Sequence, residues 1–327
     1  MRVTRSLKTL ALVAALGTVA ASNVRAQDYP SRSVRVVIPF APAGVTDIVS
    51  RIVFDAMSSK LGQPMVIENR PGASGTIATE FVADAAPDGY TLLINDPSGP
   101  LATSVSLYVS RPFDPLKRLA PIAMFGSTGA IVAVPSTLPV KTLQEFVALA
   151  KAKPNEMFFG STGIGTPGHL NGELFRSVVG IEATHVPYRV GTQGVTDLLS
   201  GRLTFWVIPL PAVFPYVKDG RIRVLAVAGE QRLADLPDVP TVKESGFSEL
   251  DLSTMYAMFA PAGVPPNVVA RLSRATDEVL NIDTVQQRLK LAGVQPLIAP
   301  AARVTEVLKT KIGQWAEVIK RAGITPH

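Results

Sequence analysis

The stretch PFAPAGVTD, residues 39–47, follows an apolar, β-branched strand pattern at residues 34–38 and leads into a helical pattern. A second stretch, GSTGIGTPGH at residues 160–169, stands in the same setting after the strand pattern at 157–159. Glycine lets a backbone approach a ligand closely, and a helix N-terminus presents unpaired N–H groups and partial positive charge. Two such loops in one chain predict a site that holds a small anion from both sides.

Around these loops, strand and helix patterns alternate along most of the chain. Strand patterns lie at residues 34–40, 65–68, 90–95, 131–134, 157–159, 184–186, 203–208, 223–228 and 255–260. Helical spacing of apolar residues follows most of them, and the chain closes with helical patterns at 266–280, 284–292 and 303–322. This alternation predicts an α/β protein with mostly parallel, doubly wound sheets. Prolines stand at turns rather than in one linker, which indicates two domains that the chain crosses more than once.

The N-terminus has the pattern of a secretory signal peptide. A basic segment at residues 2–8 precedes a short apolar stretch at 10–21, and Ala26 ends a small-residue cleavage motif. A membrane anchor is the alternative, but a spanning helix needs about 20 apolar residues. We therefore expect residues 1–26 to be removed by cleavage after Ala26, and we expect a periplasmic protein.

Composition limits the classes of partner. The whole chain carries a net charge of +6, but residues 1–26 contain four basic residues and no acidic one, which leaves +2 on the mature chain. No basic run with interleaved aromatic residues occurs, so we expect no nucleic-acid partner. The absence of cysteine excludes disulfides and thiolate chemistry. A mature chain of roughly 300 residues is long enough for a core that needs no covalent reinforcement.

The second loop also matches two enzyme patterns. Its glycine spacing at residues 163–168 satisfies the dinucleotide fingerprint, but Pro167 removes a donor N–H inside the loop. Ser161 and His169 would suit a periplasmic hydrolase, which we keep as an alternative, although no GxSxG elbow surrounds Ser161. The three histidines show no metal-ligand spacing to carboxylates. We expect no catalytic residue, no cofactor and no metal ion.

Two polar residues stand where the helices after the loops begin. Asp47 is expected to cap the first helix, with contact to a ligand or to water as the alternative. Thr166 precedes Pro167 and forms a typical pair of N-cap and first helical residue. A cap whose neighbouring N–H groups face a ligand can serve both structure and binding.

Further motifs give the chain a family resemblance over nearly the whole mature sequence. Beyond the two loops, they are ENRPGASG at residues 68–75, APDGYTLL at 86–93, HVPY at 185–188, LPDVPT at 236–241 and APAG at 260–263. In this order the motifs resemble the solute receptors of the tripartite tricarboxylate transporter family, a group of bacterial periplasmic binding proteins.

The resemblance implies an α/β, two-lobed periplasmic binding protein of the Venus-flytrap, type II-like kind, in which each lobe is a doubly wound sheet with flanking helices. It places residues 27–128 and 252–327 in lobe 1 and residues 129–251 in lobe 2. The lobes are expected to close on a small organic carboxylate held by backbone and hydroxyl groups of the two loops. The residues implied to bind it are Phe40, Ala43, Gly44, Thr46 and Asp47 in lobe 1, and Ser161, Thr162, Gly163, Gly165, Thr166 and Ile208 in lobe 2. The expected partners of this monomer are the membrane subunits of the tripartite transporter.

Several positions depart from the usual pattern of the family. Ala43 stands where a second glycine is common, and Thr204 and Ile208 stand where many members carry aspartates. Strand alternation places Thr204, Trp206 and Ile208 on one face. This face either packs in the core or lines the cleft, where it would favour a ligand with an apolar far end over an amino acid. A ligand sensor for a membrane signalling protein is a further alternative.

Overall fold

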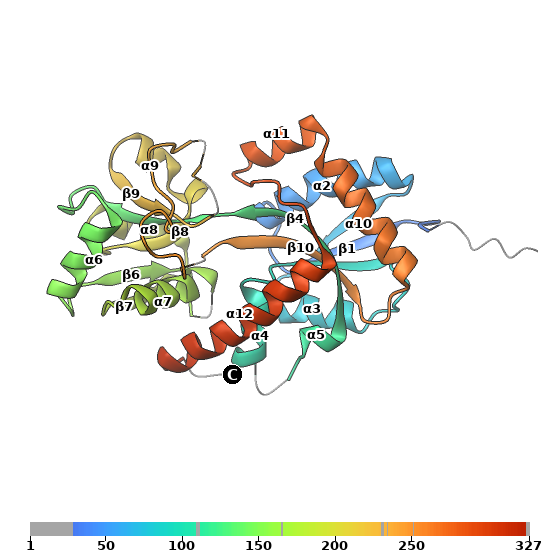
Figure 1. Ribbon diagram of the computed structural model, residues 1–327, viewed down its shortest axis with the longest axis horizontal. Helices are drawn as coiled ribbons and strands as arrows, with labels where there is room; N and C mark the ends of the chain where they lie inside the picture. Colours follow the sequence, from blue (N-terminus) through green and yellow to red (C-terminus); the bar gives the residue numbers. More distant parts are fainter. Residues whose placement is uncertain are drawn as a thin grey trace, which may run out of the picture.

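The computed structural model describes residues 29–108, 112–164, 166–229, 232–233, 235–250 and 252–324. The predicted signal peptide at residues 1–26 and the predicted ligand residue Gly165 lie outside these ranges. The described chain forms two lobes, one coloured blue to cyan and orange to red, the other green to yellow (Figure 1). The described elements are helices and strands of an α/β protein, as the alternating pattern predicted.

Lobe 1 is built around a six-stranded sheet in the order β11-β4-β10-β3-β1-β2. Strands β1, β2 and β3 pair in parallel, with α2 between β1 and β2 and α3 between β2 and β3. The strands are β1 (Val34–Ile38), β2 (Met65–Asn69), β3 (Thr91–Asn95), β4 (Leu119–Thr128), β10 (Thr254–Pro261) and β11 (Ala299–Pro300). The helices are α2 (Val45–Leu61), η1 (Ala73–Gly75), α3 (Thr76–Ala83), α4 (Pro100–Leu107), α5 (Pro115–Arg118), α10 (Pro266–Leu280), α11 (Asp283–Leu291) and α12 (Ala301–Arg321).

Lobe 2 contains a three-stranded antiparallel sheet in the order β8-β5-β9 and a parallel pair, β6 and β7. A β-bridge between Phe159 and Phe205 links the two pieces. The strands are β5 (Ala130–Pro135), β6 (Phe158–Ser161), β7 (Thr184–Pro187), β8 (Trp206–Pro209) and β9 (Ile222–Val227). The helices are α6 (Leu143–Ala152), α7 (Pro167–Val179), α8 (Gly191–Leu199), η2 (Leu210–Ala212) and α9 (Phe214–Lys218).

Two neighbouring strands run between the lobes. β4 leads into β5 of lobe 2 after the single residue Gly129, and β10 brings the chain back into the sheet of lobe 1. β4 and β10 pair antiparallel because they run in opposite directions between the lobes. The sheets are therefore mixed, whereas the alternating pattern predicted mostly parallel ones. The sequence analysis did not predict β4, because Pro121 and Gly126 interrupt its apolar pattern, and both stand beside register shifts of the pairing.

Strand alternation gives the sheet of lobe 1 two buried faces. Val34 and Val36 pack on one face with the apolar sides of α2 and α10, whereas Val37 packs on the other face with α3, α4 and α12. The core of this second face continues into lobe 2, where it includes Val132 and Val134 of β5. One apolar core therefore passes beside the crossing strands from lobe to lobe.

Helix α12 lies along lobe 1 and reaches α7 of lobe 2 (Figure 1). The indole Nε1 of Trp315 on α12 donates a hydrogen bond to the carbonyl of Ser98 at 2.6 Å, just before α4. Trp315 is buried, and its bond holds the helix against the end of β3. None of the helices in the described ranges combines the length and the apolar character needed to cross a bilayer.

Gly129 offers a test of the crossing. An added Cβ at Gly129 would lie 2.0 Å from the backbone carbonyl oxygen of Ala228, so Gly129→Ala should lower the free energy of unfolding by about 1–3 kcal/mol. Gly313 in α12 meets nothing within 4 Å, so the control Gly313→Ala should raise it by about 0.5–1 kcal/mol. Urea denaturation measures the free energy of unfolding of both variants, and equal changes in the two would contradict the steric role of Gly129.

Candidate functional site

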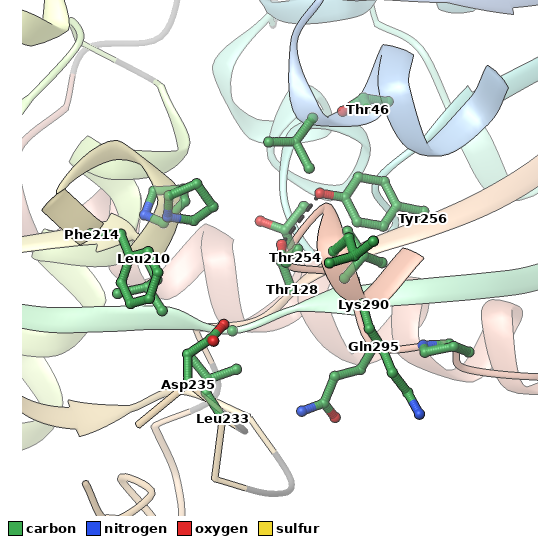
Figure 2. Close-up of a pocket in the computed structure, with 18 of the residues that line it drawn as sticks. Thr46, Thr128, Leu210, Phe214, Leu233, Asp235, Thr254, Tyr256, Lys290 and Gln295 are labelled. Carbon is green, nitrogen blue, oxygen red and sulfur yellow. Dashed lines mark hydrogen bonds between the residues drawn. The ribbon is translucent and has the colours of Figure 1, made fainter. Parts of the chain in front are cut away.

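A cleft of about 1510 Å³ lies between the lobes (Figure 2). Lobe 1 lines it with the loop before α2, the end of β3, the end of α11 and the segment at residues 293–298. Lobe 2 lines it with η2, α9 and the side chains of Leu233 and Asp235. Both lobes thus contribute to one space, as a receptor that closes on its ligand requires.

The crossing strands form part of the cleft wall. Thr128 ends β4 and pairs with Thr254 at the start of β10, and both residues line the cleft together with Gly129 and Tyr256. The hydroxyl oxygens of Thr128 and Tyr256 are 3.3 Å apart. Burial raises the pKa of Tyr256 to about 12, so its phenol stays protonated at neutral pH. Thr128, Thr254 and Tyr256 offer hydroxyl groups to the cleft, and none of the four residues carries a charge at neutral pH.

The loop at residues 39–47 reaches the cleft at the N-terminus of α2. Phe40, Val45 and Thr46 line the cleft, and Figure 2 shows Thr46 at this end of it. Gly44 is the N-cap residue, so Val45 and Thr46 occupy the first turn and their N–H groups have no acceptor within the helix. The positive end of the helix dipole adds to these donors. This end of the cleft suits an anion.

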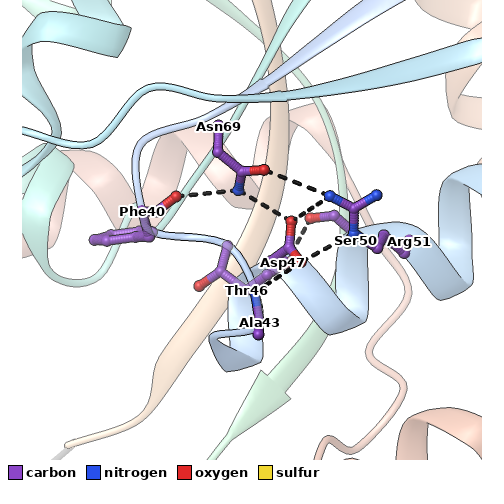
Figure 3. A network of polar contacts seen from close by, with 7 residues as sticks. All are labelled: Phe40, Ala43, Thr46, Asp47, Ser50, Arg51 and Asn69. Carbon is purple, nitrogen blue, oxygen red and sulfur yellow. Dashed lines mark hydrogen bonds and ion pairs between the residues drawn. The ribbon is translucent and has the colours of Figure 1, made fainter.

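Asp47 lies beneath this loop and does not line the cleft (Figure 3). Its carboxylate accepts hydrogen bonds from Ala43 N–H at 3.0 Å, Arg51 Nε at 2.9 Å and Asn69 Nδ2 at 3.0 Å. Asn69 Nδ2 also donates to the carbonyl of Phe40 at 3.1 Å. The bond from Arg51, aided by those from Asn69 and Ala43, lowers the pKa of Asp47 to about 2 against the opposing effect of burial. The network fixes both ends of the loop.

The prediction that Asp47 caps α2 needs correction. Gly44 occupies the N-cap position with no side-chain cap, and the Asp47 carboxylate bonds to Ala43, one residue before that cap. Ala43 has φ 64°, a left-handed conformation that costs roughly 1–2 kcal/mol for a residue other than glycine. Ala43 and Gly44 therefore shape the turn of the loop, while Phe40 and Thr46 are the residues at its two ends that line the cleft.

The loop at residues 160–169 turns inward. Its described residues contribute Pro167, the first residue of α7, to the cleft lining. Ser161 is fully buried; its hydroxyl oxygen lies 2.6 Å from Nε2 of His185 and accepts a hydrogen bond from the Gly163 N–H at 3.0 Å. Ser161 and Gly163 thus hold the loop to β7 in this structure, and neither lines the cleft.

The two threonines of this loop lie outside the cleft lining as well. Thr162 is exposed. Thr166 occupies the predicted N-cap position of α7, but its hydroxyl donates to the carbonyl of Gly163 at 2.7 Å and accepts no hydrogen bond from the helix. The expected side-chain cap is therefore replaced by a bond within the loop.

The face of β8 that carries Ile208 packs in the core of lobe 2. Trp206 and Ile208 are buried, and the Thr204 hydroxyl accepts a hydrogen bond from the Phe158 N–H at 3.0 Å. Ile208 does not line the cleft, so the core alternative for this face holds in the structure. The chain immediately after β8 lines the cleft instead, through η2 and α9 with Leu210 and Phe214.

Sequence reasoning missed Asp96, which follows β3 at the cleft. Its carboxylate Oδ1 accepts hydrogen bonds from the Ser98 N–H at 2.8 Å, the Ser98 hydroxyl at 2.5 Å and the Met255 N–H at 3.1 Å. Burial raises the pKa of Asp96 to about 6. Its position at the carboxyl end of a parallel strand was the available signal, since ligands of open α/β sheets bind at that edge.

A buried histidine pair stands behind the second loop. The rings of His169 and His185 stack with centroids 3.8 Å apart, and His169 Nε2 lies 3.7 Å from Oε1 of Glu173. Ser161 thus contacts His185, not the His169 that the hydrolase alternative required. Burial, and then the neighbouring His169, lower the pKa of His185 to about 4. Across the described ranges, no group of three or more His, Cys, Asp or Glu side chains is placed to hold a metal ion.

Two α/β lobes, a pair of crossing strands and a cleft lined from both lobes define a two-lobed solute-binding protein. Comparison with known proteins shows the family to which the chain belongs. Residues 49–324 match the profile of the tripartite tricarboxylate transporter family receptor. The chain belongs to this family of periplasmic solute-binding proteins, which confirms the resemblance drawn from its motifs.

Similar proteins cover the chain almost completely. Protein BugT of Bordetella pertussis is 34% identical over 323 residues, 99% of each chain. A solved structure of a Rhodopseudomonas palustris protein with adipate is 32% identical, with a TM-score of 0.75, over 92% of this chain and 100% of that one. MatC of Rhodopseudomonas palustris, solved with bound malate, is 28% identical, with a TM-score of 0.71, over 89% and 100%.

The Asp47 network predicts a pH-dependent stability. Because folding lowers the pKa of Asp47 from 3.8 to about 2, its contribution of about 2 kcal/mol is present above pH 4 and is lost as the pH falls toward 2. Asp47→Asn should therefore destabilise the protein by about this amount at pH 7 and by less at pH 3. Asp55→Asn, at an exposed position of the same helix, is the control. Urea denaturation at both pH values measures the free energy of unfolding of each variant. A loss of stability in Asp47→Asn that is the same at pH 7 and pH 3 would contradict the prediction.

Proposed function

We propose that this protein is a periplasmic receptor that captures a small organic carboxylate between its lobes and delivers it to the membrane subunits of a tripartite tricarboxylate transporter. Export through the N-terminal signal, with cleavage after Ala26, and a monomeric state belong to this proposal. The observation that carries it is the N-terminus of α2, which opens into the interlobe cleft with Thr46 in its first turn. Two relatives, one solved with adipate and one with bound malate, support a carboxylate as the class of ligand.

The first loop is prepared for an anion before a ligand arrives. Its acidic residue, Asp47, is turned away from the cleft and neutralised by Arg51, so no carboxylate of the loop opposes a bound anion. The N–H of Ala43 is used by this network, which leaves the first-turn donors of α2 for the ligand. A loop held rigid in this way loses little entropy on binding.

The hydrolase alternative receives little support. Ser161 has no exposed surface and its hydroxyl is engaged with His185 and Gly163, so a substrate carbonyl has no path to it in this structure. A receptor role agrees with the family of the chain. A ligand sensor would share the same cleft, and co-purification with transporter membrane subunits or with a signalling protein distinguishes the two.

We further propose residues 27–128 and 252–327 as lobe 1, and 129–251 as lobe 2, with the hinge where β4 meets β5. The ligand then contacts both lobes, and binding favours a closed arrangement because only differential affinity shifts such an equilibrium. Small-angle X-ray scattering should show a smaller radius of gyration with a saturating carboxylate than without it. An unchanged radius, for a protein shown to be open when empty, would contradict closure.

Thr46 tests the anion site itself. Thr46→Val keeps the shape of the side chain and removes the hydroxyl, and the loss of one hydrogen bond to a charged ligand should weaken carboxylate binding roughly tenfold or more. Thr305→Val in α12, whose hydroxyl bonds to the Ala301 carbonyl outside the cleft, is the matched control. Isothermal titration calorimetry measures both variants, and equal affinities would count against the site at α2.

A further inference from the structure

We infer that the cleft selects a monocarboxylate with an uncharged, apolar body and discriminates against dicarboxylates. This inference rests on the proposed carboxylate receptor and names the class of its ligand. It follows from the side chains that line the cleft beyond the anion site at Thr46, because these are apolar or acidic and offer little to a second anionic group.

The wall that faces the crossing strands is apolar. Leu210 of η2 and Phe214 of α9 stand side by side on the lobe 2 side of the cleft, across from Tyr256 and Thr254 (Figure 2). Val294 adds apolar surface from lobe 1. A second carboxylate placed against this wall would lose its hydration without gaining a donor, and burying an unpaired charge is costly. A hydrocarbon chain or an aromatic ring would instead gain by leaving water.

An acidic group of the cleft acts in the same direction. Asp235 presents its carboxylate beside Leu210 (Figure 2). Like charges within a few ångströms in a partly desolvated site repel strongly. A ligand with a single carboxylate at α2 keeps its charge away from Asp235, whereas a dicarboxylate does not.

The two cationic residues of the lining do not offset the charge of Asp235. The guanidinium of Arg232 is engaged, with Nε 2.9 Å from Oε2 of Glu244 and Nη1 donating to the carbonyl of Pro237 at 3.0 Å. The side chain of Lys290 extends away from Thr46 and from the apolar wall (Figure 2). Neither cation therefore stands where the far end of a short diacid bound at α2 would lie.

Three six-carbon probes separate the two parts of the inference. Hexanoate carries one carboxylate, adipate carries two on the same chain, and hexanamide replaces the carboxylate by a neutral amide. We expect hexanoate to bind at least roughly tenfold more tightly than adipate and than hexanamide in isothermal titration calorimetry. 3-Phenylpropanoate, with an aromatic body, should bind as well as hexanoate or better.

Variants then assign the selectivity to named side chains. Phe214→Ala should weaken hexanoate binding roughly tenfold, whereas Phe158→Ala, outside the cleft on β6, should leave it unchanged. Asp235→Asn should narrow the gap between hexanoate and adipate, whereas Asp219→Asn at the end of α9 should not. Thermal melting without ligand confirms that each variant is folded.

The outcomes separate failure of the inference from failure of the proposed function. Adipate binding as tightly as hexanoate overturns the selectivity and leaves the carboxylate receptor standing. Hexanamide binding as tightly as hexanoate, or no binding by any of the acids, overturns the receptor function and the inference with it. A hexanoate preference that survives both Phe214→Ala and Asp235→Asn overturns the assignment to this wall.

Discussion

The antiparallel pairing of β4 with β10 is the constraint on which the rest of the structure depends. These strands run between the lobes in opposite directions, and their hydrogen bonds make the crossing a part of the lobe 1 sheet. The pair joins the two lobes while Thr128 and Thr254, at the paired ends of the two strands, line the cleft between them. A single crossing strand would leave its other edge without hydrogen-bond partners.

The chain is tightly packed where β4 passes into β5. Gly129 passes the carbonyl of Ala228 so closely that a side chain does not fit, and the Ala228 N–H donates to the Ala130 carbonyl at 2.7 Å. Asp96 ties the end of β3 to the start of β10 through the Met255 N–H. These contacts fix the chain on both sides of the point where β4 passes into β5.

The two glycine-containing loops resemble each other in sequence and differ in what satisfies their polar groups. In the first, Asp47 and Asn69 bind the loop from behind, so the first turn of α2 faces the cleft with its donors free for a ligand. In the second, Ser161 and Thr166 bond within the loop and to His185, and those groups are turned inward.

Sequence alone determined the class of fold, the strand and helix alternation, the family and the loop that presents Thr46 to the cleft, because periodicity, glycine placement and ordered motifs are local properties. Only the tertiary structure decided which side chains meet. β4 escaped prediction because Pro121 and Gly126 are tolerated there by register shifts with a strand more than 120 residues away. Ile208 and Phe214 lie six positions apart, yet one is buried and the other lines the cleft, because the chain turns at η2. Whether a side chain is buried in the core or lines the cleft depends on contacts with residues distant in the chain, and no local sequence pattern encodes those contacts.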